Sequence, residues 1–153
     1  MSNEPTAKIL FRVPNSDGDA TVETLWAIPI GDDLYRLDNS PFYAYGVSWQ
    51  DVVLAPYDEH EGFPTFRSVV ERSGNRTLRI FFDSPVEPDN ASDQVLQVLV
   101  ALGCSYEGAN RRYVSINIPP VVELQRVCSY LTDRKAQWEY ADPTYDALFP
   151  SET

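Results

Sequence analysis

The spacing of apolar residues changes near residue 77 of this chain. Before that point, short segments alternate apolar and polar side chains, as half-buried strands do. After it, two stretches place apolar residues three or four positions apart, as amphipathic helices do. The change predicts an α+β protein with a β-rich N-terminal half, residues 1–76, and a mixed C-terminal half, residues 77–153, packed together as one compact unit.

The N-terminal half predicts five short strands and no helix. The strands are expected at residues 8–13, 22–30, 34–38, 51–55 and 65–71, with turns or loops at residues 14–18, 31–33 and 56–62 and an irregular aromatic stretch at residues 41–48. Trp26 is expected to lie in the core. Because the strands are short and joined by turns rich in glycine and proline, we expect a small β-barrel or a tightly curved antiparallel sheet.

The C-terminal half predicts the order strand, helix, strand, strand, helix, strand. The strands are expected at residues 77–83, 104–107, 112–118 and 137–140. The first helix should begin after Asn90, with Asp93 three residues later, and end at Gly103. The second should begin at Pro119-Pro120, with an apolar stripe of Val121, Leu124, Val127, Cys128 and Leu131. This order is that of a ferredoxin-like half, with both helices on one face of a four-stranded antiparallel sheet. The tail from Pro143 to Thr153 is expected to dock loosely.

The chain is strongly acidic, and the excess is shared by both halves. It holds 23 acidic and 12 basic side chains, for a formal net charge of −11. A field of this sign repels phosphate backbones and anionic lipids, so a nucleic acid or membrane partner is disfavoured. The same field would speed the encounter with a basic protein.

Three sequence features favour a cytoplasmic protein. No stretch reaches the roughly 20 apolar residues of a membrane helix. The first five residues lack the basic and then apolar run of a signal peptide. Cys104 and Cys128 do not make a disulfide framework, and we expect both to be small buried residues in a reducing compartment.

The sequence offers little catalytic chemistry. His60 is the only histidine, and it lies in the acidic loop between Asp58 and Glu61, where solvent would surround it. A general base needs fixed geometry and a tuned pKa, which a mobile exposed loop does not supply. Adjacent side chains of one loop, such as those of Asp58, His60 and Glu61, rarely converge on one metal ion. We therefore expect no enzyme activity, no catalytic residues, no cofactor and no metal site.

Two regions combine aromatic area with negative charge, and both are candidate partner-binding surfaces. The first consists of Tyr43, Tyr45, Trp49 and Asp51 with the following loop residues Tyr57, Asp58, Glu59 and Glu61; the second consists of Trp138, Glu139, Tyr140, Asp142, Tyr145 and Asp146. Tyrosine and tryptophan are enriched at interface hot spots, and carboxylates around them would pair with lysine and arginine. The alternative is that these rings pack the core or the contact between the halves.

Several short motifs occur in a characteristic order. They are Phe11-Arg12-Val13-Pro14, Leu25-Trp26-Ala27 with Pro29 and Gly31-Asp32, Tyr35-Arg36-Leu37-Asp38-Asn39 with Pro41-Phe42, Gly46-Val47-Ser48 with Asp51-Val52-Val53, and Val69-Val70-Glu71-Arg72-Ser73-Gly74 with Thr77-Leu78-Arg79. This succession resembles a bacterial domain-of-unknown-function family, the one numbered 4265, over about residues 8–142. The resemblance brings no catalytic residues with it. Small acidic proteins of this type, some encoded near secreted toxins, look like immunity proteins.

The leading hypothesis is an immunity-type inhibitor that binds and covers a cognate basic bacterial toxin, for example a nuclease. We expect a free monomer that forms a one-to-one complex. The second hypothesis is a small-molecule-binding regulatory domain, which would need a concave pocket with converging polar groups. The third is an enzyme that uses the acidic loop, which predicts lost activity on His60→Ala.

Overall fold

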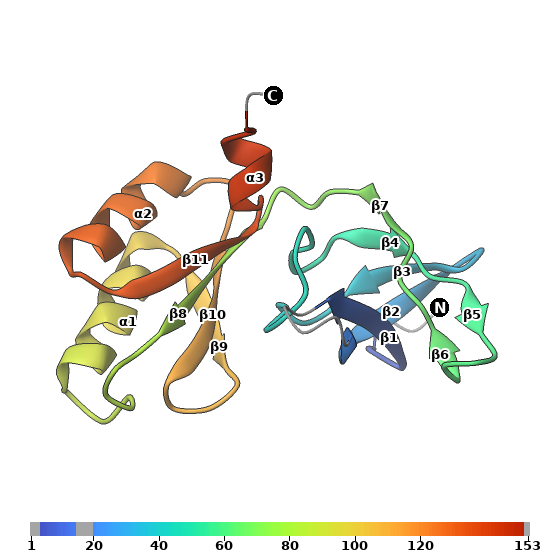
Figure 1. The fold of residues 1–153 in the computed structure, drawn as a ribbon, viewed down its shortest axis with the longest axis horizontal. Coiled ribbons are helices and arrows are strands. Elements are labelled where there is room, and N and C mark those ends of the chain that lie inside the picture. The colour runs from blue at the N-terminus through green and yellow to red at the C-terminus, as the bar shows by residue number, and fades with distance from the viewer. Residues whose placement is uncertain (1–3, 15–19, 152–153) are drawn as a thin grey trace.

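The computed structural model describes residues 4–14 and 20–151. Two parts lie side by side: an N-terminal part built of strands, and a C-terminal part whose two longer helices lie on the side away from it (Figure 1). An α+β fold is therefore confirmed. Most of the turn expected at residues 14–18 lies outside the described residues. None of the described helices has the length and apolar character needed to cross a membrane.

The N-terminal part is one curled sheet with a small hairpin beside it. Its strands are β1 (Ala7–Pro14), β2 (Ala20–Gly31), β3 (Leu34–Leu37), β4 (Val52–Leu54), β5 (Tyr57–Asp58), β6 (Phe63–Pro64) and β7 (Ser68–Glu71). Five of them form an antiparallel sheet in the order β1-β2-β3-β4-β7. Just before β7, Thr65 bridges to Leu10 of β1, and the backbone N–H of Phe66 donates to the Leu10 carbonyl at 2.9 Å. The two edges thus approach each other, as in a half-barrel.

Three expectations for this part are wrong. Trp26 is 43% exposed, because side chains alternate along β2 and its neighbours Leu25 and Ala27 take the core side. The Trp26 ring instead lies 4.8 Å from the ammonium of Lys8. The segment expected as the loop 56–62 contains most of the β5–β6 hairpin. The strand expected from residue 65 starts only at Ser68, as β7, because the residues before it contact β1.

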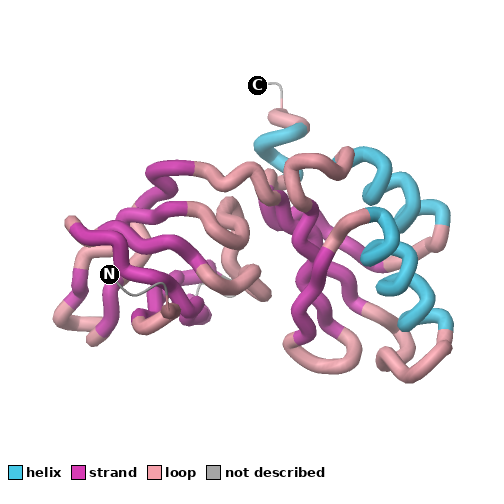
Figure 2. The backbone as a smooth tube through the Cα atoms, turned by 180° about the vertical axis from the view of Figure 1, so that it is seen from behind, coloured by secondary structure: helices cyan, strands magenta, loops and turns pink. Residues whose placement is uncertain are grey.

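The C-terminal part has the expected order of elements. They are β8 (Arg76–Phe81), α1 (Ala91–Leu102), β9 (Ser105–Gly108), β10 (Tyr113–Ile118), α2 (Leu124–Asp133), β11 (Gln137–Asp142) and a further short helix α3 (Tyr145–Leu148). The sheet order is β11-β8-β10-β9, and all neighbouring strands are antiparallel. Helices α1 and α2 cover the same face of this sheet (Figures 1 and 2). Apolar residues of both helices and of β8 and β10 form the core there, including Leu78, Ile80, Leu99, Ile116 and Leu131.

The ends of the helices follow the local sequence, with one correction. The Asn90 side chain accepts a hydrogen bond from the backbone N–H of Asp93 at 2.9 Å, as the capping pattern predicts. Gly103 ends α1 with a left-handed φ of 111°. Helix α2, however, begins only at Leu124. The proline pair forms a turn ahead of it, which leaves Val121 exposed and outside the apolar stripe.

The other face of the four-stranded sheet is polar and packs against the N-terminal half. Thr77, Arg79, Ser115 and Asn117 alternate with the core residues of β8 and β10, and all four are buried. Buried polar atoms need hydrogen-bond partners. Their burial defines the contact between the halves, called the joint below.

The irregular segment at residues 40–44 lies in the joint and supplies acceptors to the sheet. The hydroxyl of Ser115 donates to the carbonyl of Pro41 at 2.9 Å, and the guanidinium of Arg79 donates to the carbonyl of Ala44 at 2.8 Å. A segment without regular structure can be buried here because side chains replace the missing ladder of backbone bonds.

The backbone N–H groups of the same segment donate to a residue of the N-terminal sheet. The buried carboxylate of Glu23, on β2, accepts from the backbone N–H groups of Phe42 at 2.7 Å, Tyr43 at 3.2 Å and Ala44 at 2.9 Å. Hydrogen bonds to an ionised acceptor are stronger than neutral ones. Glu23 therefore holds residues 40–44 in the conformation in which their carbonyl groups accept hydrogen bonds from Ser115 and Arg79 of the four-stranded sheet.

Candidate functional site

A cavity of about 570 Å³, called the aromatic cavity below, lies beside β11 and α3. It is lined by Tyr45, Trp138, Glu139, Tyr140, Thr144, Tyr145 and Asp146. Strand β11 is an edge strand, so its outer side is not covered by another strand. Five of the expected binding residues of the second region meet here, together with one from the first.

Helix α3 builds one wall of this cavity. Its Tyr145 ring lies 6.2 Å from that of Tyr140, and Phe149 lies 4.9 Å from Tyr145. Trp138 meets Tyr140 edge-on at 4.9 Å, which continues the wall along β11. Residues 145–149 of the tail are therefore docked by ring contacts, in contrast to the loose end expected from its sequence.

Tyr45, which directly follows the irregular segment 40–44, reaches the cavity from the N-terminal half. Its hydroxyl donates to Glu139 Oε2 at 2.9 Å, and its ring lies 4.4 Å from the guanidinium carbon of Arg79. Burial, followed by the hydrogen bond to Glu139, raises the pKa of Tyr45. Arg79 Nε donates to the other oxygen of Glu139 at 3.0 Å, so the charge of Glu139 is balanced. Asp146 has no partner among the described residues and supplies the unbalanced charge of the cavity.

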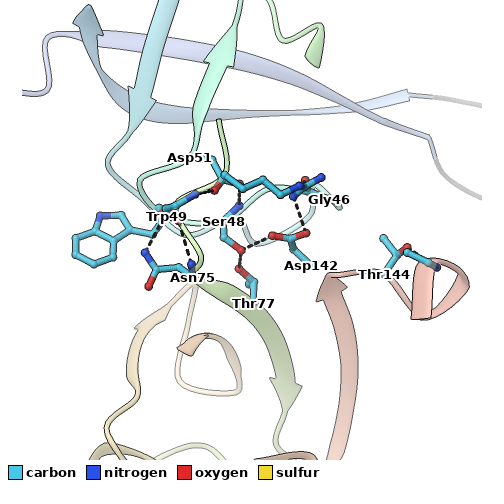
Figure 3. A network of polar contacts seen from close by, with 11 residues as sticks. Gly46, Ser48, Trp49, Asp51, Asn75, Thr77, Asp142 and Thr144 are labelled. Carbon is cyan, nitrogen blue, oxygen red and sulfur yellow. Dashed lines mark hydrogen bonds and ion pairs between the residues drawn. The ribbon is translucent and has the colours of Figure 1, made fainter. Parts of the chain in front are cut away.

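A buried polar network lies next to the cavity, within the joint (Figure 3). The hydroxyl of Ser48 donates to Asp142 Oδ2 at 2.6 Å and is 2.6 Å from the hydroxyl of Thr77. Because the proton of Ser48 faces Asp142, the hydroxyl of Thr77 donates to Ser48. Arg72 pairs with the other oxygen of Asp142 at 3.2 Å. Asp142 is only 5% exposed, so it fastens the halves and does not face a partner.

Asp51 has a similar internal role. Its carboxylate accepts from the backbone N–H groups of Ser48 at 2.9 Å and of Ser73 at 2.8 Å, and it is buried. Asp51 and Asp142 were both expected on a docking surface. Burial became favourable because each carboxylate is met by two donors: those of Asp51 lie 3 and 22 positions away in the sequence, and those of Asp142 lie 94 and 70 positions away.

The protonation of Asp142 should change stability with pH. Burial raises the pKa of Asp142 above 3.8, and its contacts with Ser48 and Arg72 offset only part of that effect. The folded protein thus keeps this proton at pH values where the unfolded chain has lost it. This stabilisation is complete below the unfolded pKa and is lost as the pH rises through the folded pKa. In urea unfolding, we expect the destabilisation caused by Asp142→Asn to grow as the pH falls from about 7 to about 4. A cost that shrinks over this range would contradict the assignment.

The remaining expected residues lie elsewhere. Tyr43 is exposed and stacks on Tyr113 at 5.8 Å, outside the aromatic cavity. Trp49 lines a different cavity in the joint. The loop residues 57–61 lie on the β5–β6 hairpin, at the end of the N-terminal half that is far from α3 (Figure 1). The first region therefore does not form one continuous surface.

The hairpin carries its own internal contacts. Asp58 Oδ1 accepts from the backbone N–H groups of His60 at 2.8 Å and Glu61 at 3.2 Å. Glu61 also pairs with Arg12 of β1. His60 is exposed. Within residues 4–14 and 20–151, no group of three or more His, Cys, Asp or Glu side chains is arranged to hold a metal ion.

Sequence reasoning missed four residues that build the site. Arg79 and Glu23 hold the segment that carries Tyr45, and Thr144 and Phe149 belong to the wall formed around α3. The alternation in β8 gave no signal for Arg79, because a charged residue between Leu78 and Ile80 is expected to face solvent when only one face of a strand is buried.

The comparisons with known proteins show a shared fold. A solved structure, described as the novel crystal structure of a hypothetical protein from Neisseria gonorrhoeae, is 16% identical, with a TM-score of 0.77 that covers 92% of this chain and 96% of that chain. No curated protein sequence matches the chain. Residues 23–140 match the family model described as "Domain of unknown function (DUF4265)". This match confirms the family part of the resemblance noted in the sequence, and the chain belongs to the DUF4265 family.

Proposed function

We propose that this protein is an immunity-type inhibitor that binds a cognate basic toxin at the aromatic cavity. The observation that carries the proposal is the convergence of Tyr45, Trp138, Tyr140 and Tyr145 with the carboxylate of Asp146, which pairs with no other residue in the part of the chain that the structure describes. We further infer that the protein acts in the cytoplasm as a monomer in one-to-one complexes. Its scaffold would be a ferredoxin-like C-terminal half, which the β-α-β-β-α-β order and the sheet order β11-β8-β10-β9 support.

The chemistry of the cavity suits an arginine or lysine side chain. A cation is attracted to the faces of tyrosine and tryptophan rings, and more strongly when water is excluded. A carboxylate beside the rings adds a charge-assisted hydrogen bond. Rings that are held by their neighbours lose little entropy on binding, so they are effective anchors.

The charge of the whole chain supports the same type of partner. A net charge of −11 would steer a basic protein toward the inhibitor. A toxin that cleaves nucleic acids needs a cationic groove for phosphates, and an acidic surface can occupy that groove. A nuclease is therefore the preferred partner class.

The decisive variant is Asp146→Lys, tested against the purified product of the open reading frame adjacent to this gene. Reversing an exposed charge should slow association about tenfold at low salt, and the difference should fall as salt screens the field.

Removing an anchor ring with Tyr145→Ala should weaken affinity about thirtyfold, chiefly through faster dissociation. Stopped-flow association rates and growth protection of cells that express the toxin measure both effects.

Glu59→Lys is the matched control. It makes the same charge change at an exposed position on the distant β5–β6 hairpin. We expect it to have a much smaller effect on association than Asp146→Lys. Equal effects of the two variants would place binding away from the aromatic cavity. Equal association rates at low and high salt would rule out electrostatic steering.

A small-molecule-binding regulatory domain is the second candidate, and the concave shape of the aromatic cavity favours it. Aromatic walls with a few converging polar groups are typical of ligand pockets. Thermal stabilisation by metabolites, and not by any basic protein, would favour this alternative.

A further inference from the structure

A second cavity of about 500 Å³, called the arginine cavity below, lies where the segment that links the two halves meets the start of α3. Arg72 lines it from the link between β7 and β8, Arg76 from the start of β8, and Asp142 and Thr144 from the end of β11 and the cap of α3. It shares only Thr144 with the aromatic cavity. Its volume is typical of sites for small molecules.

The charge of this cavity is opposite in sign to that of the chain. The chain holds 23 acidic and 12 basic side chains, yet two guanidinium groups line the cavity and Asp142 is the only carboxylate among its described lining residues. Asp142 is itself buried, and burial raises its pKa, so its negative charge is disfavoured. The cavity is therefore a local positive site in an acidic protein.

Arg76 forms no ion pair within residues 4–14 and 20–151. Its Nη2 donates to the carbonyls of Pro119 and Val122, which fixes the side chain in place. Of its two unpaired nitrogens, Nε is buried, whereas Nη1 keeps access to solvent. A half-buried cation without a counter-ion has lost water without gaining an opposite charge, and this is costly. An anion that reaches Nη1 would supply the missing charge.

Arg72 and Thr144 add further donors to the cavity. Both printed contacts of the Arg72 side chain use Nη1, which donates to the carbonyl of Gly46 at 3.3 Å and to Asp142 Oδ1 at 3.2 Å. Its Nε and Nη2 have no acceptor among the described residues, and the side chain is 61% exposed. The hydroxyl of Thr144 accepts from the backbone N–H of Ala147 at 3.2 Å, which leaves its own proton to donate.

We propose that the arginine cavity binds a small phosphate monoester in its dianionic form. Arg72, Nη1 of Arg76 and the hydroxyl of Thr144 each donate to one of its three terminal oxygens, and guanidinium groups suit phosphate in charge and geometry. The field of the whole chain disfavours long polyanions such as nucleic acids. A small ligand is influenced mainly by the nearest charges, because salt screens those beyond about 8 Å. This site is independent of the proposed toxin-binding function.

Methyl phosphate is the probe, and dimethyl phosphate is the matched control. Both are tetrahedral, but at a pH of about 8 the monoester carries two negative charges and three terminal oxygens, whereas the diester carries one charge and two such oxygens. Calorimetry should show that methyl phosphate binds about tenfold more tightly, because the diester leaves one charged donor without its acceptor. Succinate, a dicarboxylate of equal charge, should bind more weakly than methyl phosphate.

Two variants assign the binding to this cavity. Arg72→Gln should weaken methyl phosphate binding about tenfold, whereas Arg67→Gln, which removes an exposed guanidinium elsewhere in the N-terminal half, should leave it unchanged. Methyl phosphate should raise the unfolding temperature of the unmodified protein and of Arg67→Gln, and much less that of Arg72→Gln. Arg72 does not line the aromatic cavity, and no toxin enters this experiment, so either proposal can fail without the other.

A measurement on the unmodified protein keeps the proposal testable if Arg72→Gln fails to fold. In a nuclear magnetic resonance titration with methyl phosphate, the Nε–H signal of Arg72 should shift, and that of Arg67 should not. The proposal is overturned if methyl phosphate does not bind, if dimethyl phosphate or succinate binds as tightly, or if Arg72→Gln and Arg67→Gln bind it equally. A stationary Arg72 signal would also overturn it.

Discussion

Arg79→Ala should lower the free energy of unfolding by about 3 kcal/mol. The Arg79 side chain is 1% exposed and bonds Glu139, the carbonyl of Ala44 and the carbonyl of Tyr43. Removing one partner of a buried pair costs about 3–5 kcal/mol, and the lower end applies because Glu139 is 44% exposed and regains water. Urea unfolding followed by tryptophan fluorescence measures the change.

The variant should also disturb the aromatic cavity, since the guanidinium of Arg79 supports the ring of Tyr45. Arg67→Ala is the matched control: it removes an exposed guanidinium from the N-terminal half, and its effect should stay within about 0.5 kcal/mol. A loss below about 1 kcal/mol in Arg79→Ala would mean that the joint does not depend on this charge.

Glu23→Ala should lower the free energy of unfolding by about 2–4 kcal/mol. The substitution leaves three backbone N–H groups, those of Phe42, Tyr43 and Ala44, without their charged acceptor. Glu23→Gln should have a smaller effect, because its amide retains one oxygen that accepts. The same urea experiment applies, with Glu71→Ala on the exposed side of β7 as the control.

Hydrogen exchange distinguishes a local effect from general destabilisation. In Glu23→Ala, the amides of Phe42, Tyr43 and Ala44 should exchange much faster, while those in the centre of α1 should change only in proportion to global stability. Uniform acceleration across both groups would contradict a specific role in holding the segment. Because Tyr45 follows directly in the chain, the loss of this order should also weaken partner binding.

The local pattern of the sequence determined most of the secondary structure. Alternation predicted β1, a mainly apolar stretch bounded by turn residues predicted β2, and the period of three to four with Asn90 and Gly103 at its ends predicted α1. These features depend on neighbours in the chain, so a single sequence reveals them. The change of period near residue 77 likewise coincides with the start of β8 at Arg76.

Where the local sequence pattern predicted the wrong structure, a contact between residues far apart in the sequence explains the difference. The proline pair was expected to start a helix, but Arg76 bonds the carbonyls of Pro119 and Val122 and holds that stretch as a turn. Helix α3 is too short to form alone, and its rings dock on Tyr140.

In the candidate site, too, the sequence indicated some features and the tertiary structure alone decided others. Aromatic and acidic composition identified Tyr45, Trp138, Tyr140 and Tyr145 as residues of interest, since residue type alone indicates binding potential. Only the tertiary structure brought Tyr45 to Glu139, 94 positions later in the chain, and buried Asp51 and Asp142. The sequence by itself thus determined the elements and the overall charge. Folding decided which carboxylates face solvent and which fasten the joint, because burial of a charge depends on donors that distant segments provide.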